Sequence, residues 1–243
     1  MTKFHFVKDY ERLALYLRLK HSREEAMSLA VGGQYEQFGL KEAEILQYAG
    51  LRDDQSLLDF GCGSGRLAWA LGQKNISIDY CGIDIVKTFL RYAKKKSPPN
   101  YRFILNRSLS IPLPDASFDM ASAFSVFTHL LHHESYNYLE ELHRVVRPSG
   151  IVVFSFLEFS EPTHWEMFQY TIRAYRKARL PHLNQYIERS QIKLWSEKIG
   201  YQDASFVAST DSPWGIPGPS VRVWRSCRDR QARHFFSYEA AVR

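Results

Sequence analysis

The feature that most constrains the fold of this 243-residue chain is a glycine-rich segment that follows a short apolar run. Residues 57–65 read Leu-Leu-Asp-Phe-Gly-Cys-Gly-Ser-Gly, which predicts a buried strand that enters a tight turn. Glycine adopts backbone torsions closed to other residues and lets the main chain approach a ligand closely. Asp84 ends the next predicted strand, where its carboxylate is placed to accept hydrogen bonds from ribose hydroxyls. Together, the turn and Asp84 predict a cofactor pocket.

The spacing of the glycines distinguishes between two classes of cofactor. A dinucleotide-binding turn reads G-x-G-x-x-G, which would place its third glycine at position 66. Here position 66 is Arg66 and the third glycine is Gly65, so the turn reads G-x-G-x-G. This spacing disfavours a nicotinamide-dependent oxidoreductase.

With the preceding Leu58 and Asp59, the turn resembles the first motif of the class I S-adenosylmethionine-dependent methyltransferases, small-molecule type. Three later segments follow in that family's order, namely LPDASFD at 113–119, AFSVFTHL at 123–130 and RVVRPSG at 144–150. The resemblance extends over about residues 30–226. It implies S-adenosyl-L-methionine as the cofactor and S-adenosyl-L-homocysteine as its product.

The order of apolar segments predicts the fold class. Predicted strands at 56–60, 79–84, 101–105, 119–124 and 151–156 alternate with helical patterns, which predicts an α/β fold with a doubly wound, mostly parallel sheet and helices on both faces. Further helices are predicted at 41–48, 158–181 and 190–199, and further strands at 204–208 and 221–224. The resemblance implies that these last strands complete a seven-stranded sheet with one antiparallel strand near the C-terminus.

We expect three parts along the chain. Residues 1–50 are predicted to form an N-terminal helical lid, and residues 51–226 the methyltransferase domain. Residues 158–193 break the alternation of strands and helices, and we interpret them as a cap-like insertion. Residues 227–243 form a basic C-terminal tail that lies beyond the resemblance.

The composition of the chain indicates in which cellular compartment the protein resides and which kinds of partner it can bind. The net charge of +6 and pI near 9.2 permit a nucleic-acid partner without requiring one. Cys62, Cys81 and Cys227 have no C-x-x-C spacing and leave one thiol over from any disulfide, which predicts a reducing compartment and no zinc site. The N-terminus lacks the apolar core of a signal peptide, and no apolar run approaches the roughly 18 residues of a membrane span. We therefore expect a cytoplasmic protein without a membrane partner.

The resemblance implies roles for the residues of the glycine turn. Gly61, Cys62, Gly63 and Gly65 are expected to surround the methionine end of the cofactor, with backbone N–H groups and the start of the next helix facing its carboxylate. Asp59, just before the turn, is expected to hold the loop and the amino group. The alternative is a turn with a structural role alone.

The nucleoside end of the cofactor is assigned to residues after the second and third strands. Asp84 is expected to bind the ribose, although an aspartate there also suits the start of the following helix. Ile85 is expected to lie along the adenine ring. The family often carries an acid after strand three, and Asn106 stands in this region instead, as an adenine contact or part of a surface turn.

Two further regions are assigned to the cofactor. Phe124 and Ser125 follow strand four, where the family passes the chain close to the sulfonium, and an aromatic ring or carbonyl suits that cation. Tyr35 and Phe38 precede the first strand and suit either a lid or core packing, with core packing favoured for Phe38.

Candidates for catalysis and acceptor binding come later in the chain. His129 is the candidate general base, with a loop-stabilising role as the alternative. It begins the sequence HLLHH, which lacks a carboxylate partner at standard metal-site spacing, so no metal is expected. Glu158, His164 and Trp165 are predicted to line the acceptor cavity, or else to belong to a packed cap or a dimer contact.

These assignments favour methyl transfer to an oxygen or nitrogen of a small molecule. The first alternative is an RNA or other nucleic-acid methyltransferase, favoured by the basic pI and the arginine-rich C-terminus. It is disfavoured because no Asn-Pro-Pro-Tyr tetrapeptide follows strand four and no separate RNA-binding module is evident. The second alternative is a protein that binds S-adenosylmethionine without catalysis. The sequence indicates neither the acceptor nor the oligomeric state.

Overall fold

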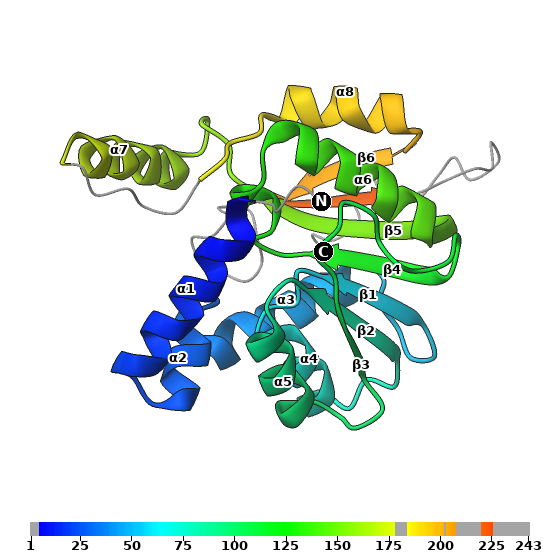
Figure 1. The fold of residues 1–243 in the computed structure, drawn as a ribbon. Helices are drawn as coiled ribbons and strands as arrows, with labels where there is room; N and C mark the ends of the chain where they lie inside the picture. The colour runs from blue at the N-terminus through cyan, green and yellow to red at the C-terminus, as the bar shows by residue number, and fades with distance from the viewer. Residues whose placement is uncertain (1–4, 178–183, 202, 208–219, 226–243) are drawn as a thin grey trace, which may run out of the picture.

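The computed structural model describes residues 5–177, 184–201, 203–207 and 220–225, which form a sheet with helices on both of its faces (Figure 1). Every residue of the first strand is buried, which agrees with its apolar sequence. The strands are β1 (Ser56–Phe60), β2 (Asp79–Asp84), β3 (Arg102–Leu105), β4 (Phe118–Ala123), β5 (Val146–Phe156), β6 (Asp203–Val207) and β7 (Ser220–Arg225).

The order of the strands determines where a ligand can bind. Among the described residues, the sheet runs β3-β2-β1-β4-β5-β7-β6. The first five strands pair in parallel, whereas β7 is antiparallel to both β5 and β6. The order reverses between β1 and β4, and sheets of this kind bind ligands at the carboxyl ends of the strands beside such a reversal. The predicted α/β class with a mostly parallel sheet is confirmed.

Helices pack against the sheet through apolar faces. On one face, α4 buries Leu67 and Leu71 beside residues of β1 and β2. On the other, α6 buries Leu139 and Leu142 beside residues of β4 and β5. The helices are α1 (His5–Lys20), α2 (Arg23–Leu29), α3 (Tyr35–Tyr48), α4 (Arg66–Gln73), α5 (Lys87–Lys96), η1 (Phe127–His129, a 3-10 helix), α6 (His132–Val145), α7 (Pro162–Arg176) and α8 (Arg189–Ile199).

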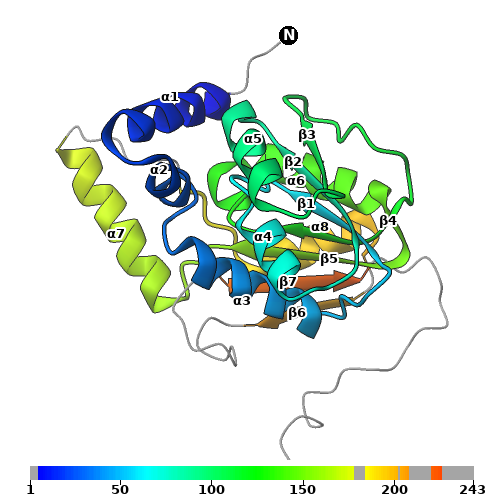
Figure 2. The ribbon, with the colours of Figure 1, turned by 90° about the horizontal axis from the view of Figure 1, so that it is seen from below.

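The first two helices lie beside the sheet rather than within either of its layers (Figure 2). Helix α1 buries Ala14 and Leu17 in an apolar cluster that contains Met27 of α2 and Phe89 of α5. Ser22 is the N-cap residue of α2, and its side chain accepts a hydrogen bond from the Glu25 backbone N–H. The two helices are therefore attached to the part of the domain that follows β2.

Two elements begin earlier than their sequence patterns indicate. Helix α3 was predicted to begin at residue 41, but it begins at Tyr35. The sequence pattern missed the first turns because they are polar and because Gly39 interrupts the apolar period. A Cβ at Gly39 would collide with the Arg66 carbonyl group, so α3 crosses the start of α4 at close range. Strand β5 begins at Val146, and its register with β4 shifts between Phe118 and Met120.

Helix α7 projects from the rest of the structure after β5 (Figure 1). His164 is the buried residue of this helix, while Trp165, Tyr170 and Tyr175 are exposed. None of the helices in the described part of the chain is long and apolar enough to cross a membrane.

Candidate functional site

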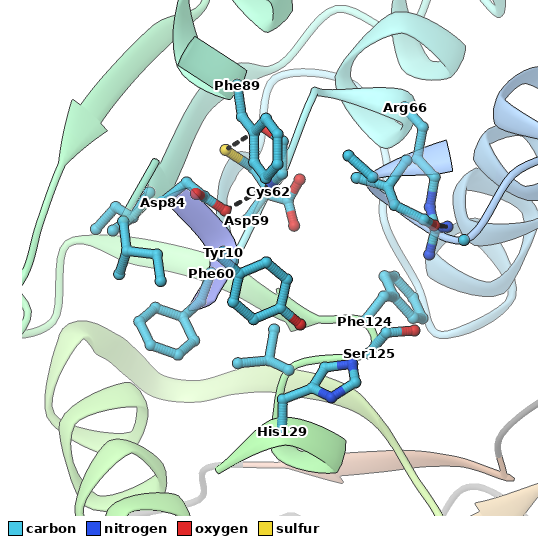
Figure 3. A pocket seen from close by; sticks show the side chains of 18 of the residues that line it. Tyr10, Asp59, Phe60, Cys62, Arg66, Asp84, Phe89, Phe124, Ser125 and His129 are labelled. Carbon is cyan, nitrogen blue, oxygen red and sulfur yellow. Dashed lines mark hydrogen bonds between the residues drawn. The ribbon is translucent and has the colours of Figure 1, made fainter. Parts of the chain in front are cut away.

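A cavity of about 560 Å³ lies at the carboxyl ends of β1, β2 and β4. The glycine turn forms one wall, and the segment that follows β4 forms another (Figure 3). Residues of α1 and α2, including Leu13, Leu17 and Leu29, also line it. Its volume falls within the roughly 300–1,000 Å³ of small-molecule sites in proteins.

The glycine turn is packed tightly against two other segments. Gly61 and Gly63 line the cavity with positive φ angles of 74° and 55°. A Cβ on Gly63 would lie 2.7 Å from a methyl group of Val31, and a Cβ on Gly61 would collide with Val126. Only glycine satisfies both the torsion and the close approach at these positions. The turn thereby brings backbone close to a ligand in the cavity.

The third glycine lies at the start of α4, away from the cavity wall. Gly65 has a φ of 85° at the start of α4, and it is not among the residues that line the cavity. A Cβ there would lie 2.5 Å from the Cβ of Ala93. Gly65 therefore permits close packing of α4 against α5.

Asp84 joins the glycine turn to the loop after β2. Its Oδ2 accepts a hydrogen bond from the Gly63 N–H at 2.9 Å, and its Oδ1 accepts one from the Val86 N–H at 2.8 Å. Burial raises the pKa of this carboxyl to about 6, although the backbone hydrogen bonds oppose the shift. Val86, not Asp84, occupies the N-cap position of α5. The cavity is lined by both Asp84 and Ile85.

Asp59 provides a second buried carboxylate in the cavity (Figure 3). It accepts hydrogen bonds from the Tyr80 hydroxyl at 2.6 Å and the Ser122 hydroxyl at 3.1 Å. Burial raises its pKa to about 7, against the opposing effect of the Tyr80 hydrogen bond. Two carboxyl groups with raised pKa values in a mainly apolar cavity favour a ligand that carries positive charge and hydrogen-bond donors.

Asn106 lines the cavity, but its amide is already used within its own loop. The side-chain oxygen accepts hydrogen bonds from the backbone and hydroxyl of Ser108, and the side-chain nitrogen donates to the Ser110 carbonyl at 2.8 Å. The structure thus places Asn106 at the expected wall and gives it a role in shaping the loop.

The segment after β4 bends around the opposite side of the cavity. Phe124 and Ser125 both line it, and Ser125 has a φ of 56°. The backbone N–H of Ser125 donates a hydrogen bond of 2.7 Å to the hydroxyl of Ser155 in β5. This bond fixes the turn that carries the two residues.

The three histidines of the HLLHH sequence have separate environments. His129 lines the cavity from η1, and its ring lies edge-on to that of Tyr10, with centroids 5.9 Å apart. His132 interacts with the Tyr186 carbonyl at 3.0 Å and with the Gln185 side chain at 2.9 Å. His133 is exposed. Within the described residues, no group of three potential metal ligands is found.

Besides Gly65, four of the expected site residues do not line the cavity, namely Tyr35, Glu158, His164 and Trp165. Tyr35 supports the glycine turn from outside, because its hydroxyl donates to the Ser64 carbonyl at 2.9 Å. Glu158 is fully buried and forms two hydrogen bonds of 2.8 Å with Arg189. His164 is buried and accepts from the Glu158 N–H at 3.1 Å, and Trp165 is 45% exposed on α7.

Sequence patterns did not reveal an ion pair that borders the methionine end of the expected cofactor. The Arg66 guanidinium pairs with Glu42 and donates to the Val31 carbonyl, and both charged residues line the cavity. Burial raises the pKa of the Glu42 carboxyl above its ordinary value, although the charge and hydrogen bond of Arg66 oppose this shift. Arg66 could have been suspected from its place directly after the turn, but nothing in the sequence marks Glu42 as its partner.

Comparisons with known proteins find similarity to methyltransferases. Residues 58–154 match the model of a family described as a methyltransferase domain. A demethylmenaquinone methyltransferase of Thermus thermophilus is 31% identical over 130 residues, which are 52% of this chain and 57% of that protein. A tRNA N(3)-methylcytidine methyltransferase of Schizosaccharomyces pombe is 26% identical over 110 residues, which are 42% of this chain and 36% of that protein. The chain thus matches part of each relative.

Solved structures share the fold. An S-adenosylmethionine-dependent methyltransferase of Thermotoga maritima superimposes with a TM-score of 0.58. The superposition covers 91% of this chain and 95% of the other, at 16% sequence identity. The likeness therefore extends from the domain core to the elements on either side of it.

Proposed function

Since the chain contains a methyltransferase domain of the class I S-adenosylmethionine-dependent family, we propose that it transfers a methyl group to an oxygen or nitrogen of a small molecule. The acceptor would bind in the same cavity as the cofactor. The observation that carries this proposal is the continuity of that cavity from the glycine turn and Asp84 to His129, beneath α1.

The donor set of the cavity fits S-adenosylmethionine. In this proposal, the backbone of Gly61 and Gly63 and the carboxyl of Asp59 hold the methionine end, and Asp84 accepts from the ribose hydroxyls. Ile85 and Asn106 border the adenine. The raised pKa values of Asp59 and Asp84 support this assignment, because positive charge and hydrogen-bond donors on a ligand stabilise the ionised carboxylates.

Methyl transfer requires little from the protein beyond alignment and a place for a proton. When bound, the cofactor supplies an activated methyl group. Phe124 and Ser125 border the region expected for that methyl group, and a rigid wall there would align it with the acceptor. His129 faces the same cavity and would accept the proton that a hydroxyl or ammonium acceptor loses.

The division of the chain into functional parts is also proposed. In this proposal residues 1–50 act as the lid over the cavity, to whose lining α1 and α2 contribute, and residues 51–226 act as the catalytic domain. The expected cap at 158–193 would act at a distance from the cavity wall, because Glu158, His164 and Trp165 do not line it. The tail at 227–243 lies outside the described residues.

One rival function has specific support. The pI of about 9.2 and the tRNA-modifying relative favour a nucleic-acid acceptor. Against it, the cavity is lined mainly by apolar side chains, some of them from α1, which suits a compact acceptor better than a nucleotide within a polymer. Salt dependence separates the two functions, because contacts with phosphates weaken steeply as salt rises.

Methyl-labelled S-adenosylmethionine tests the proposal. The purified chain is incubated with a panel of small hydroxyl and amine compounds and, separately, with total tRNA. We expect label in a small compound, and a loss of about 100-fold or more in turnover for His129→Gln with unchanged cofactor affinity. Label in tRNA, with binding that falls steeply with salt, would support the rival instead. Cofactor binding without transfer to any acceptor would indicate a non-catalytic binding protein.

A further inference from the structure

Helix α1 places a tyrosine inside the cavity. Tyr10 is one of its lining residues, and Figure 3 shows its ring between Asp84 and His129. The next residue, Glu11, forms an ion pair with Arg107, whose Nε also donates to the Ile85 carbonyl at 2.9 Å. These contacts attach α1 to the loops that border the expected nucleoside end, so the position of Tyr10 depends on the packing of α1.

The Tyr10 ring is oriented toward the end of the cavity opposite Asp84. In Figure 3 its hydroxyl lies on the side of Ser125 and His129. The ring centroids of Tyr10 and His129 lie 5.9 Å apart with the ring planes inclined at 74°, so two polar side chains from different chain segments lie side by side at the cavity. Burial, with a further contribution from Asp84, raises the pKa of the Tyr10 phenol well above its ordinary value. The phenol therefore stays protonated and can donate a hydrogen bond, but it cannot act as a base.

The surfaces around this pair are apolar and partly aromatic. Phe60, Phe124, Leu130 and Tyr138 all contribute to the lining of the cavity. The Tyr138 hydroxyl donates to the Ser108 carbonyl at 2.9 Å, so its ring rather than its oxygen contributes to the wall. An occupant that matches these surfaces has a flat apolar body and a polar group directed at Tyr10 and His129.

Electrostatics favours a hydroxyl over an amine as that polar group. A protonated amine would bring a second positive charge beside the cofactor's sulfonium in a cavity of low polarity, where like charges repel strongly. A phenol enters neutral, and its oxygen becomes negative as the proton leaves, which the sulfonium attracts. Phenolic hydroxyls have pKa values of about 10, within reach of an imidazole base.

We propose that Tyr10 of α1 and His129 of η1 form a subsite for the phenolic hydroxyl of an aromatic acceptor. This inference rests on the proposed methyltransferase function and specifies its acceptor class. Tyr10 donates a hydrogen bond to the acceptor oxygen, and His129 takes its proton. That oxygen forms a bond to the methyl carbon while the carbon–sulfur bond breaks and its electron pair remains on sulfur. The products are the aryl methyl ether, S-adenosylhomocysteine and an imidazolium on His129.

Binding measurements on the protein loaded with S-adenosylhomocysteine test the subsite without turnover. The probes are 2-naphthol and 4-phenylphenol, compared with naphthalene and biphenyl, which lack the hydroxyl. We expect at least one phenol to bind about tenfold more tightly than its parent hydrocarbon. Tyr10→Phe should remove most of that difference while leaving the affinity for S-adenosylhomocysteine unchanged. Tyr16→Phe is the matched control, because Tyr16 lies on the same helix and is 53% exposed.

The outcomes separate this inference from the proposed function. Equal affinity for phenols and hydrocarbons, or an unchanged preference in Tyr10→Phe, would overturn the subsite even if the protein methylates another acceptor. Failure of the wild type to bind S-adenosylhomocysteine would instead overturn the proposed function. A phenol preference lost in Tyr10→Phe and kept in Tyr16→Phe would establish the subsite.

Discussion

At the scale of single residues, two buried carboxyl groups determine the electrostatics of the site. The fold raises the pKa of Asp59 to about 7 and that of Asp84 to about 6, from ordinary values of 3.8. Their contribution to stability is therefore greatest at low pH and is lost as the pH rises through the folded pKa values. A cationic ligand that donates hydrogen bonds lowers the pKa values of both carboxyl groups, because it stabilises their ionised forms.

Cofactor affinity should consequently fall in mild acid. As the pH drops below about 6, Asp84 takes up a proton and loses an acceptor for the ribose hydroxyls. We expect the Kd for S-adenosylmethionine to rise toward a limit of about tenfold per pH unit for one proton. Calorimetric titrations at pH 8, 7, 6 and 5 measure the trend. A Kd that stays constant across this range would show that Asp84 does not bind the cofactor in its ionised form.

At the scale of elements, close approach between helices determines the shape of the glycine turn. Gly65 starts α4 with positive φ and leaves no room for a side chain against Ala93 of α5. Gly33 also has positive φ, at 80°, but a Cβ there would meet no atom within 4 Å. The two glycines therefore separate the effect of backbone torsion from that of packing.

Gly65→Ala should destabilise the protein more than Gly33→Ala. The torsion alone costs about 1–2 kcal/mol for an L-residue, and overpacking against Ala93 adds about 1–3 kcal/mol at position 65. Chemical denaturation of both variants measures the difference in the free energy of unfolding. Equal losses would mean that α4 and α5 can separate without cost, contrary to the packing described for Gly65.

The sequence predicted those elements whose pattern is local. The span 56–60 of β1 and the position of Asp84 at the end of β2 follow from apolar runs and turn residues close by in the chain. Glu158 and His164 were expected either to line the acceptor cavity or to belong to a packed cap or a dimer contact, and in the structure their side chains contact Arg189 and the Glu158 backbone N–H. Only the tertiary packing of the segment after β5 decides which way these groups face.

Pairings between distant segments were equally inaccessible from the sequence. Arg66 and Glu42 are 24 positions apart, and no periodicity relates them. Tyr10 reads as one residue of an amphipathic helix, and its place in the cavity depends on the packing of α1 against α2 and α5. The cofactor side of the site is thus largely encoded by a local motif, whereas the acceptor side is assembled by long-range contacts.

At the scale of the whole molecule, the sheet and both helical layers converge on one cavity with the cofactor motif at its wall. A ligand that binds there in the folded state alone should stabilise the entire domain, by about 2.7 kcal/mol at a concentration of 100 times its Kd. The residues that bind the ligand, above all Asp84, therefore also determine how much the ligand raises the free energy of unfolding.

The most direct test is calorimetric titration of the wild type, Asp84→Ala and Asp79→Ala with S-adenosylmethionine and S-adenosylhomocysteine. Asp79 is the matched control, since it lies at the exposed start of the same strand. We predict binding to the wild type and to Asp79→Ala with equal affinity, and a loss of about 100-fold or more in Asp84→Ala, where charge-assisted hydrogen bonds to the ribose disappear. No binding to the folded wild type, or undiminished binding to Asp84→Ala, would contradict the cofactor site described here.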